Sequence, residues 1–127
     1  MRLALPLRPL LWLDAATGIA MAGLLLGAGA DLSPLLGLPQ GLLTEAGLIL
    51  LPFVLLLAWT ATRPSPQRLA ALVVAINVSW VAASLLLLAG PWVSPTPLGT
   101  AFVLAQAGAV AVIAWLQHGA ARAFAAA

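Results

Sequence analysis

The chain has no cysteine, lysine or tyrosine, and only 6% of its 127 residues are charged. The absence of cysteine excludes disulfides, thiolate metal ligands and thiol redox chemistry. A soluble domain carries about 25% charged residues, whereas this chain combines its few charges with 64% hydrophobic residues. The composition therefore excludes an ordinary soluble domain and indicates an integral membrane protein.

Groups that perform catalysis or bind metals are equally scarce. There is one histidine, His118, and the acidic residues are Asp14, Asp31 and Glu45. Because a protein-bound catalytic metal takes three or four ligands, we expect no metal site and no cofactor. There is no phosphate-binding glycine loop, no Ser-His-Asp set and no His-Glu-x-x-His zinc motif. The sequence predicts neither an enzyme nor a nucleic-acid-binding protein, since no basic surface with aromatic residues is present.

Charged and turn-forming residues divide the chain into four apolar stretches. They cover residues 10–29, 42–61, 69–89 and 98–117. Each has about the length that crosses a bilayer as a helix. We therefore predict an all-α protein, with residues 1–127 forming one membrane domain, a bundle of four transmembrane helices. Pro66 and Pro97 are expected at the first positions of the third and fourth helices, where the missing N–H costs nothing.

The arginines indicate the orientation of the bundle. All of them precede the first span, lie between the second and third, or follow the fourth: Arg2, Arg8, Arg63, Arg68 and Arg122. The positive-inside rule then predicts that both termini of this multi-pass protein are in the cytoplasm. We expect the protein in the bacterial inner membrane. The first span could instead be a secretory signal cleaved after residues 28–30. Trp12 and Asp14 inside the apolar region argue against that alternative.

An internal repeat relates the two halves of the chain. Shifted by 61 residues, 24–47 aligns with 85–108 without a gap, with ten of 24 positions identical. The match predicts two helical hairpins, at 10–61 and 69–117, that enter the membrane from the same side. The bundle would then consist of two hairpins related by an axis along the membrane normal.

Small residues form stripes on two of the predicted helices. Gly23 and Gly27 lie four apart in the first span, and Ala105 and Gly108 lie in the fourth. Small residues at such spacing let helix backbones approach closely. We expect these residues to pack within the chain, and contact between two copies is the alternative.

The polar residues within the spans are the candidate functional residues. Ordered by depth from the cytoplasm they are Asp14, Asn77, Gln106 and Glu45, a possible proton track of the kind found in transporters. Each also has a structural interpretation. Asp14 could pair with Arg8 or Arg68, and a protonated Glu45 could hydrogen-bond to Gln106. Asn77, which shares a helix face with Ser84, could hold helices together.

Two patterns in the third and fourth spans resemble a known group of proteins. They are Asn77-x-x-Trp80-x-x-x-Ser84 and Pro95-Thr96-x-Leu98-Gly99-x-x-Phe102-x-x-Ala105-Gln106. They resemble small four-helix integral membrane proteins of uncharacterised function from GC-rich bacteria, a resemblance that covers roughly half the chain and implies no activity. Small multidrug resistance transporters share the size and an acid in the first span. The shallow Asp14, the absence of tyrosine and the lack of their central aromatic and glycine-rich patterns argue against that family.

The function expected from these features is that of an assembly factor or accessory subunit. Such a protein packs against another membrane protein, or against its own copy, in the lipid bilayer. The alternative is an oligomeric proton-coupled transporter of small molecules that uses Glu45 or Asp14 as its titrating acid.

Overall fold

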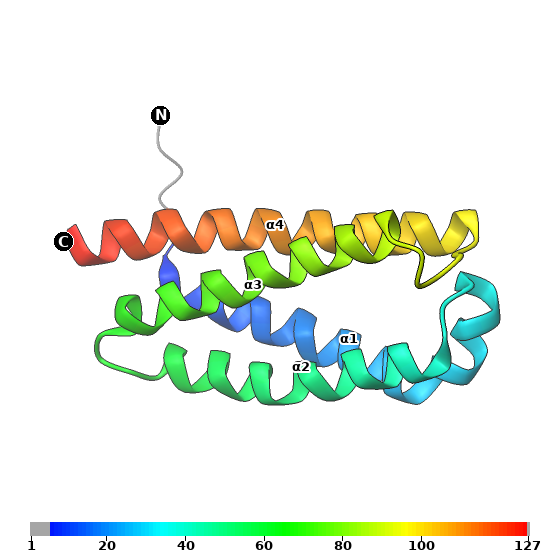
Figure 1. Ribbon diagram of the computed structural model, residues 1–127. Coiled ribbons are helices and arrows are strands. Elements are labelled where there is room, and N and C mark those ends of the chain that lie inside the picture. Colours follow the sequence, from blue (N-terminus) through cyan, green and yellow to red (C-terminus); the bar gives the residue numbers. More distant parts are fainter. Residues whose placement is uncertain (1–5, 127) are drawn as a thin grey trace.

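A computed structural model describes residues 6–126, and it consists of four helices joined by short connections (Figure 1). The helices are α1 (Leu7–Leu36), α2 (Gln40–Ala61), α3 (Pro66–Ala89) and α4 (Pro97–Ala126). All four are long and apolar enough to cross a membrane. The prediction of an all-α bundle is confirmed, and the chain is a multi-pass helical membrane protein.

The helix starts agree with the sequence, but two helix ends do not. Pro66 and Pro97 are the first residues of α3 and α4, as predicted. α1 continues past the expected end at residue 29, through Pro34, and α4 continues past residue 117. The predicted limits were too short because apolar runs report the thickness of the bilayer core, whereas a helix can extend beyond it.

A glycine in the left-handed conformation ends α1. Gly37 has φ 67°, and its N–H donates to the Ser33 carbonyl at 2.9 Å. The N–H of Leu38 donates to the same carbonyl at 3.2 Å. Glycine adopts this conformation at little cost, so the chain turns here, after Pro34, and not at the proline.

The helices form two hairpins, α1–α2 and α3–α4. α1 packs chiefly on α2, and α3 chiefly on α4, while α1 and α4 make most of the contacts between the hairpins. α2 and α3 touch little although they are consecutive. The relation of the hairpins as a sequence repeat stays a prediction.

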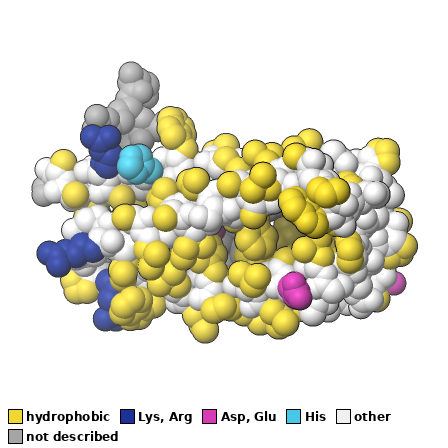
Figure 2. Space-filling view, in the orientation of Figure 1, with side chains coloured by type: hydrophobic (Ala, Val, Ile, Leu, Met, Phe, Trp, Pro, Cys, Tyr) yellow, Lys and Arg dark blue, Asp and Glu magenta, His cyan; other side chains and the backbone are white. Residues whose placement is uncertain are grey.

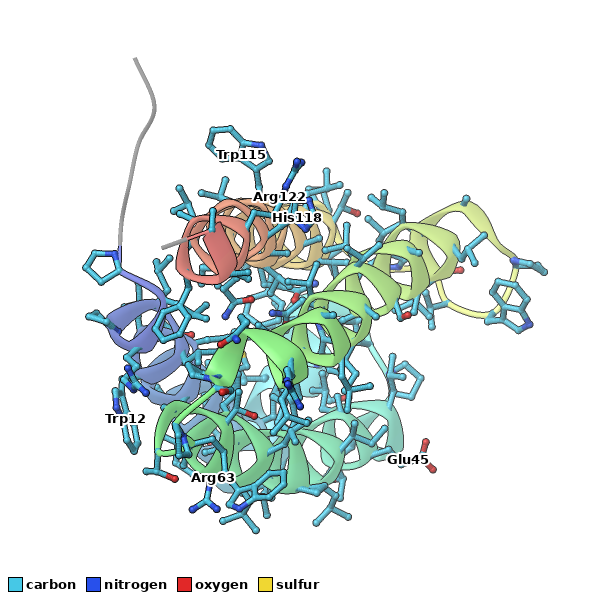
Figure 3. All side chains as sticks on the ribbon, turned by 90° about the vertical axis from the view of Figure 1, so that its left-hand side faces the viewer. Trp12, Glu45, Arg63, Trp115, His118 and Arg122 are labelled. Carbon is cyan, nitrogen blue, oxygen red and sulfur yellow. The ribbon has the colours of Figure 1, made fainter. Side chains whose placement is uncertain are left out.

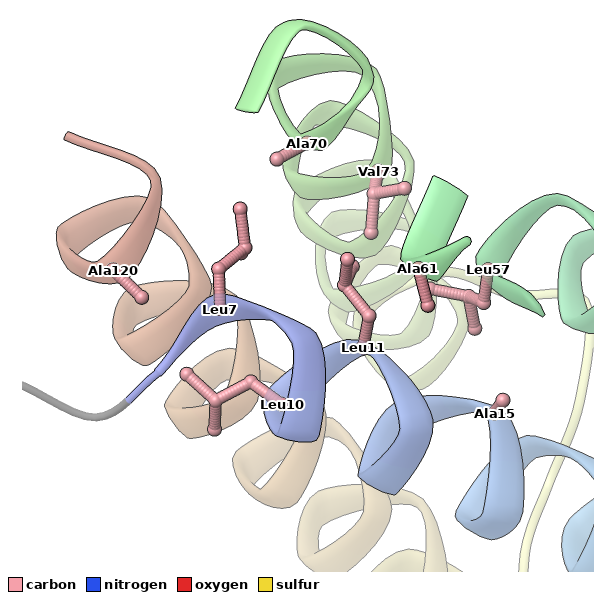
Figure 4. Close-up of a cluster of buried hydrophobic side chains, with 9 residues drawn as sticks. All are labelled: Leu7, Leu10, Leu11, Ala15, Leu57, Ala61, Ala70, Val73 and Ala120. Carbon is pink, nitrogen blue, oxygen red and sulfur yellow. The ribbon is translucent and has the colours of Figure 1, made fainter. Parts of the chain in front are cut away.

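The apolar core has one cluster at each end of the bundle. The first lies where the helices meet near the chain termini (Figure 4), and its members come from all four helices: Leu7, Leu10, Leu11, Ala15, Leu57, Ala61, Ala70, Val73 and Ala120. The second includes Leu36, Leu43 and Val103 near the opposite end. The region between the two clusters contains the polar side chains described next.

The described arginines gather at the end of the bundle where α1 begins and α4 ends (Figure 2). Arg8 binds the α2–α3 connection there, donating to the carbonyls of Ala61 at 3.2 Å and Arg63 at 2.7 Å. Its guanidinium also lies 5.5 Å from the centre of the Phe124 ring. Arg2 lies outside the described residues.

Candidate functional site: two polar clusters and a lateral groove

A hydrogen-bonded cluster joins three helices deep in the bundle; we call Asp14, Asn77 and Gln117 the inner cluster. Oδ2 of Asp14 accepts from Nδ2 of Asn77 at 2.8 Å and from Nε2 of Gln117 at 2.8 Å. Nδ2 of Asn77 also donates to Oε1 of Gln117 at 3.0 Å. These side chains are only 5%, 3% and 0% exposed. Because Asp14 belongs to α1 and its partners to α3 and α4, the cluster joins the two hairpins.

The expected pairing of Asp14 with an arginine is wrong. Asp14 binds two neutral amides, and no hydrogen bond or ion pair connects it to an arginine in residues 6–126. Arg8 uses its guanidinium for the α2–α3 connection instead. The two side chains point in different directions. Asp14 lies on the buried face of α1, whereas Arg8 reaches the carbonyl groups at the end of α2.

Gln117, the last residue of the predicted fourth span, is a member of the cluster that was not among the candidates from the sequence. A signal was present, since Gln106 and Gln117 are eleven residues apart. Eleven residues are close to three helical turns, so both amides lie on one face of α4. An inward position for Gln106 therefore implies an inward position for Gln117.

A second group, the outer cluster, consists of Trp80, Ser84 and Gln106. The indole N–H of Trp80 donates to Oε1 of Gln106 at 2.8 Å. Nε2 of Gln106 donates to Oγ of Ser84 at 3.0 Å and to the Val103 carbonyl at 2.9 Å. An indole N–H withdrawn from water needs an acceptor, and Gln106 of α4 provides one for Trp80 in the middle of α3.

Glu45 does not take part in either cluster, so its expected hydrogen bond to Gln106 is wrong. Its side chain is exposed on α2 (Figure 3), and Gln106 binds Trp80 and Ser84 instead. At 100° per residue, Glu45 lies on the side of α2 opposite the buried Leu43 and Gly47. The depth of Glu45 could be estimated from sequence, but the side of the helix that it occupies could not.

Two adjoining cavities connect the clusters to the side of the bundle. An inner cavity of about 170 Å³ is bordered by Asp14, Asn77, Trp80 and Gln106. A larger one of about 330 Å³ lies beside it, with Ala46 and Ala83 among its walls. Met21, Ile49, Trp80 and Gln106 line both. We call the larger cavity the lateral groove, because it opens as a hollow between α2 and α3 (Figure 2).

The small residues expected to pack within the chain do not do so. Gly23, Gly27, Ala105 and Gly108 are exposed, and a Cβ added to any of the three glycines would meet no atom within 4 Å. The positions lie on the outer sides of α1 and α4, away from their buried faces. Ser84, by contrast, is buried and donates to the Trp80 carbonyl at 2.8 Å.

The arrangement can hold a polar ligand. Within residues 6–126, no three His, Asp or Glu side chains lie close enough together to hold a metal ion. In both cavities the polar groups are a carboxylate, amides, hydroxyls and an indole, set in apolar walls. Comparison with known proteins found no matching family model, curated protein or solved structure.

Proposed function

We propose that the protein is an assembly factor or accessory subunit that packs against another membrane protein in the bacterial inner membrane. The observation that carries this proposal is a stripe of exposed small residues on the outer side of α1. Four small residues at helical spacing, Ala16, Ala20, Gly23 and Gly27, are all exposed there. Small residues favour close contact between transmembrane helices, and within residues 6–126 no other helix packs on Gly23 or Gly27.

The proposed partner is a transmembrane helix that lies against the α1 stripe. Nearly all described residues belong to the four helices, so the surface available to a partner is mostly the lipid-facing side of the bundle. The inner cluster holds its own hydrogen bonds within the chain and does not need a partner for them.

The test is isolation of the tagged protein in mild detergent, followed by size-exclusion chromatography. We expect a foreign membrane protein at fixed stoichiometry, retained in a Gly119→Leu variant and lost in Gly27→Leu. The two glycines are a matched pair, because both are exposed, helical and surrounded by open space. Equal retention in both variants would reject the α1 stripe, and a pure homo-oligomer disrupted by Gly27→Leu would show self-association instead.

Proton-coupled transport is the second candidate, favoured by one observation. Asp14 is a buried acid that borders an internal cavity, and ionisable residues within a membrane commonly mark ion or substrate pathways. Glu45 is exposed and forms no hydrogen bond with the described polar clusters. In proteoliposomes with an imposed proton gradient, flux of a permanently charged fluorescent cation should stop in Asp14→Asn and continue in Glu45→Gln. Flux retained in Asp14→Asn would reject Asp14 as the proton carrier.

The proposed orientation places both termini in the cytoplasm and can be tested separately. Ser65 and Ser94 are exposed residues in the connections at opposite ends of the bundle. In intact cells, a cysteine at Ser94 should react with a membrane-impermeant thiol reagent, and one at Ser65 should react only after lysis. The chain has no native cysteine to interfere. The reverse labelling pattern would overturn the orientation.

A further inference from the structure

We propose that the lateral groove and the inner cavity together bind an amphiphilic primary amine taken from the lipid phase. The protonated amino group would lie against Asp14, and the alkyl chain would extend past Trp80 into the groove. This inference is independent of the proposed accessory function, because it concerns the interior of the bundle and not the outer side of α1.

The size and the walls of the cavities fit such a ligand. Small-molecule sites are typically clefts of about 300–1,000 Å³ with mostly apolar walls and a few polar groups. The two cavities, of about 330 and 170 Å³, meet at residues that line both. The groove walls are largely aliphatic, including Leu42, Ala46 and Leu87, and they open between α2 and α3. An alkyl chain could enter from the bilayer without crossing water.

The charged groups that line the two cavities favour a cationic ligand. Asp14 is 5% exposed, and both of its hydrogen bonds use Oδ2, which leaves Oδ1 for a ligand in the adjoining cavity. Neither cavity is lined by an arginine or a histidine. Glu45 adds a second acidic group at the groove. A carboxylate within a membrane is costly unless it is paired, so an ammonium ion is the complementary partner.

The hydrogen-bonding groups favour a primary amine over a neutral alcohol. An ammonium group has three N–H donors and no acceptor. Asn77 uses Nδ2 for both of its hydrogen bonds, so its Oδ1 is a second acceptor on a residue that lines the same cavity as Asp14. A hydroxyl group has one donor and no charge, and it would gain less from the same two oxygens.

Trp80 provides a local probe, because it lines both cavities. The other tryptophans are at least 47% exposed and can be replaced by phenylalanine: Trp12, Trp59, Trp92 and Trp115. The full-length protein with Trp80 alone would be placed in nanodiscs of phosphatidylcholine. Quenching of its fluorescence would be titrated with a dodecylamine brominated near the middle of its chain, and with the identically brominated dodecanol.

We expect the amine to half-quench Trp80 at a concentration at least about tenfold lower than the alcohol, equivalent to about 1.4 kcal/mol. Asp14→Asn keeps an oxygen for the bonds from Asn77 and Gln117 but removes the charge, so it should bring the two ligands within about twofold. Ala46→Leu fills the groove from α2 and should weaken quenching by both ligands. Gly108→Leu, an exposed position with open space around it, is the control and should change neither.

Three results would overturn the proposal. Equal quenching by amine and alcohol in the parent protein would show an apolar site without charge selection. A preference for the amine that survives in Asp14→Asn but disappears in Glu45→Gln would place the cation at the rim and not in the inner cavity. Quenching unaffected by Ala46→Leu would mean that the ligands reach Trp80 from the bilayer without occupying the groove. Circular dichroism of each variant verifies that the helices are intact.

Discussion

The inner and outer polar clusters use similar chemistry for different structural purposes. Each centres on a glutamine amide in α4 and a polar residue of α3. The inner cluster also includes Asp14 of α1, so it joins the two hairpins, whereas the outer cluster lies entirely within the α3–α4 hairpin. A polar side chain in the membrane can therefore hold one hairpin together or attach one hairpin to another, depending on where its partner lies in the chain.

The clusters also differ in how completely they exclude solvent and lipid. Each side chain of the inner cluster is buried, beside the apolar core cluster near the chain termini. In the outer cluster Trp80 and Gln106 are only partly buried, and both line the lateral groove. Leaving a polar group unpaired costs more the more deeply the group is buried, so the inner cluster should contribute more to stability.

The largest expected effect comes from breaking the inner cluster at Asn77. Asn77→Leu removes two hydrogen bonds and leaves Asp14 with one amide partner, so we expect the free energy of unfolding to fall by about 2–3 kcal/mol. Unfolding by sodium dodecyl sulfate in mixed micelles measures this. Ser79→Leu is the control, because Ser79 is exposed on the same helix and its hydroxyl donates only to the carbonyl of Ala75, one turn earlier. Equal losses in the two variants would contradict a special role for the inner cluster.

A close approach of two backbones can be compared with the polar clusters. A Cβ at Gly99 would lie 1.9 Å from the Leu36 carbonyl oxygen, where the start of α4 meets the end of α1. Gly99→Ala should therefore lower stability by about 2 kcal/mol, because the two backbones must separate. Gly108→Ala meets no atom within 4 Å and should be neutral or slightly stabilising. A stable Gly99→Ala variant would mean that this junction is looser than the structure shows.

The smallest effect is expected in the outer cluster. Gln106→Leu leaves the Trp80 indole without its acceptor, at a cost of about 1 kcal/mol, because the partly open groove lets other groups approach. Without the hydrogen bond the indole is in a less polar environment, so the emission of Trp80 should shift to shorter wavelength. A loss as large as that in Asn77→Leu would remove the distinction between the clusters.

The sequence predicted most of the fold because apolar length, prolines and charges report where helices cross the membrane. The same features predict an order of depth for the polar residues, and that order stays a prediction. The sequence could not predict which side of each helix faces the bundle, since that depends on how neighbouring helices pack. Glu45 was therefore paired with Gln106 although it faces outward, and Gln117 was overlooked although it is fully buried.

The side of the helix that a residue occupies also explains why the predicted contacts of Asp14 and of the small residues on α1 are wrong. Asp14 lies near the level of the arginines, which suggested an ion pair, but it faces the interior and Arg8 does not. The stripe at Gly23 and Gly27 has the spacing of a packing face, and spacing alone does not tell whether the contacting helix belongs to the same chain.

The inner cluster couples the two hairpins, and a pair of double-mutant cycles tests this coupling most directly. One cycle combines Asp14→Ala with Asn77→Ala, and the other combines Ser84→Ala with Gln106→Ala, with unfolding measured in the same mixed micelles. We predict a coupling energy above about 1 kcal/mol for the inner pair and below about 0.5 kcal/mol for the outer pair. A coupling energy for the inner pair that is zero, or no larger than that of the outer pair, would contradict the account.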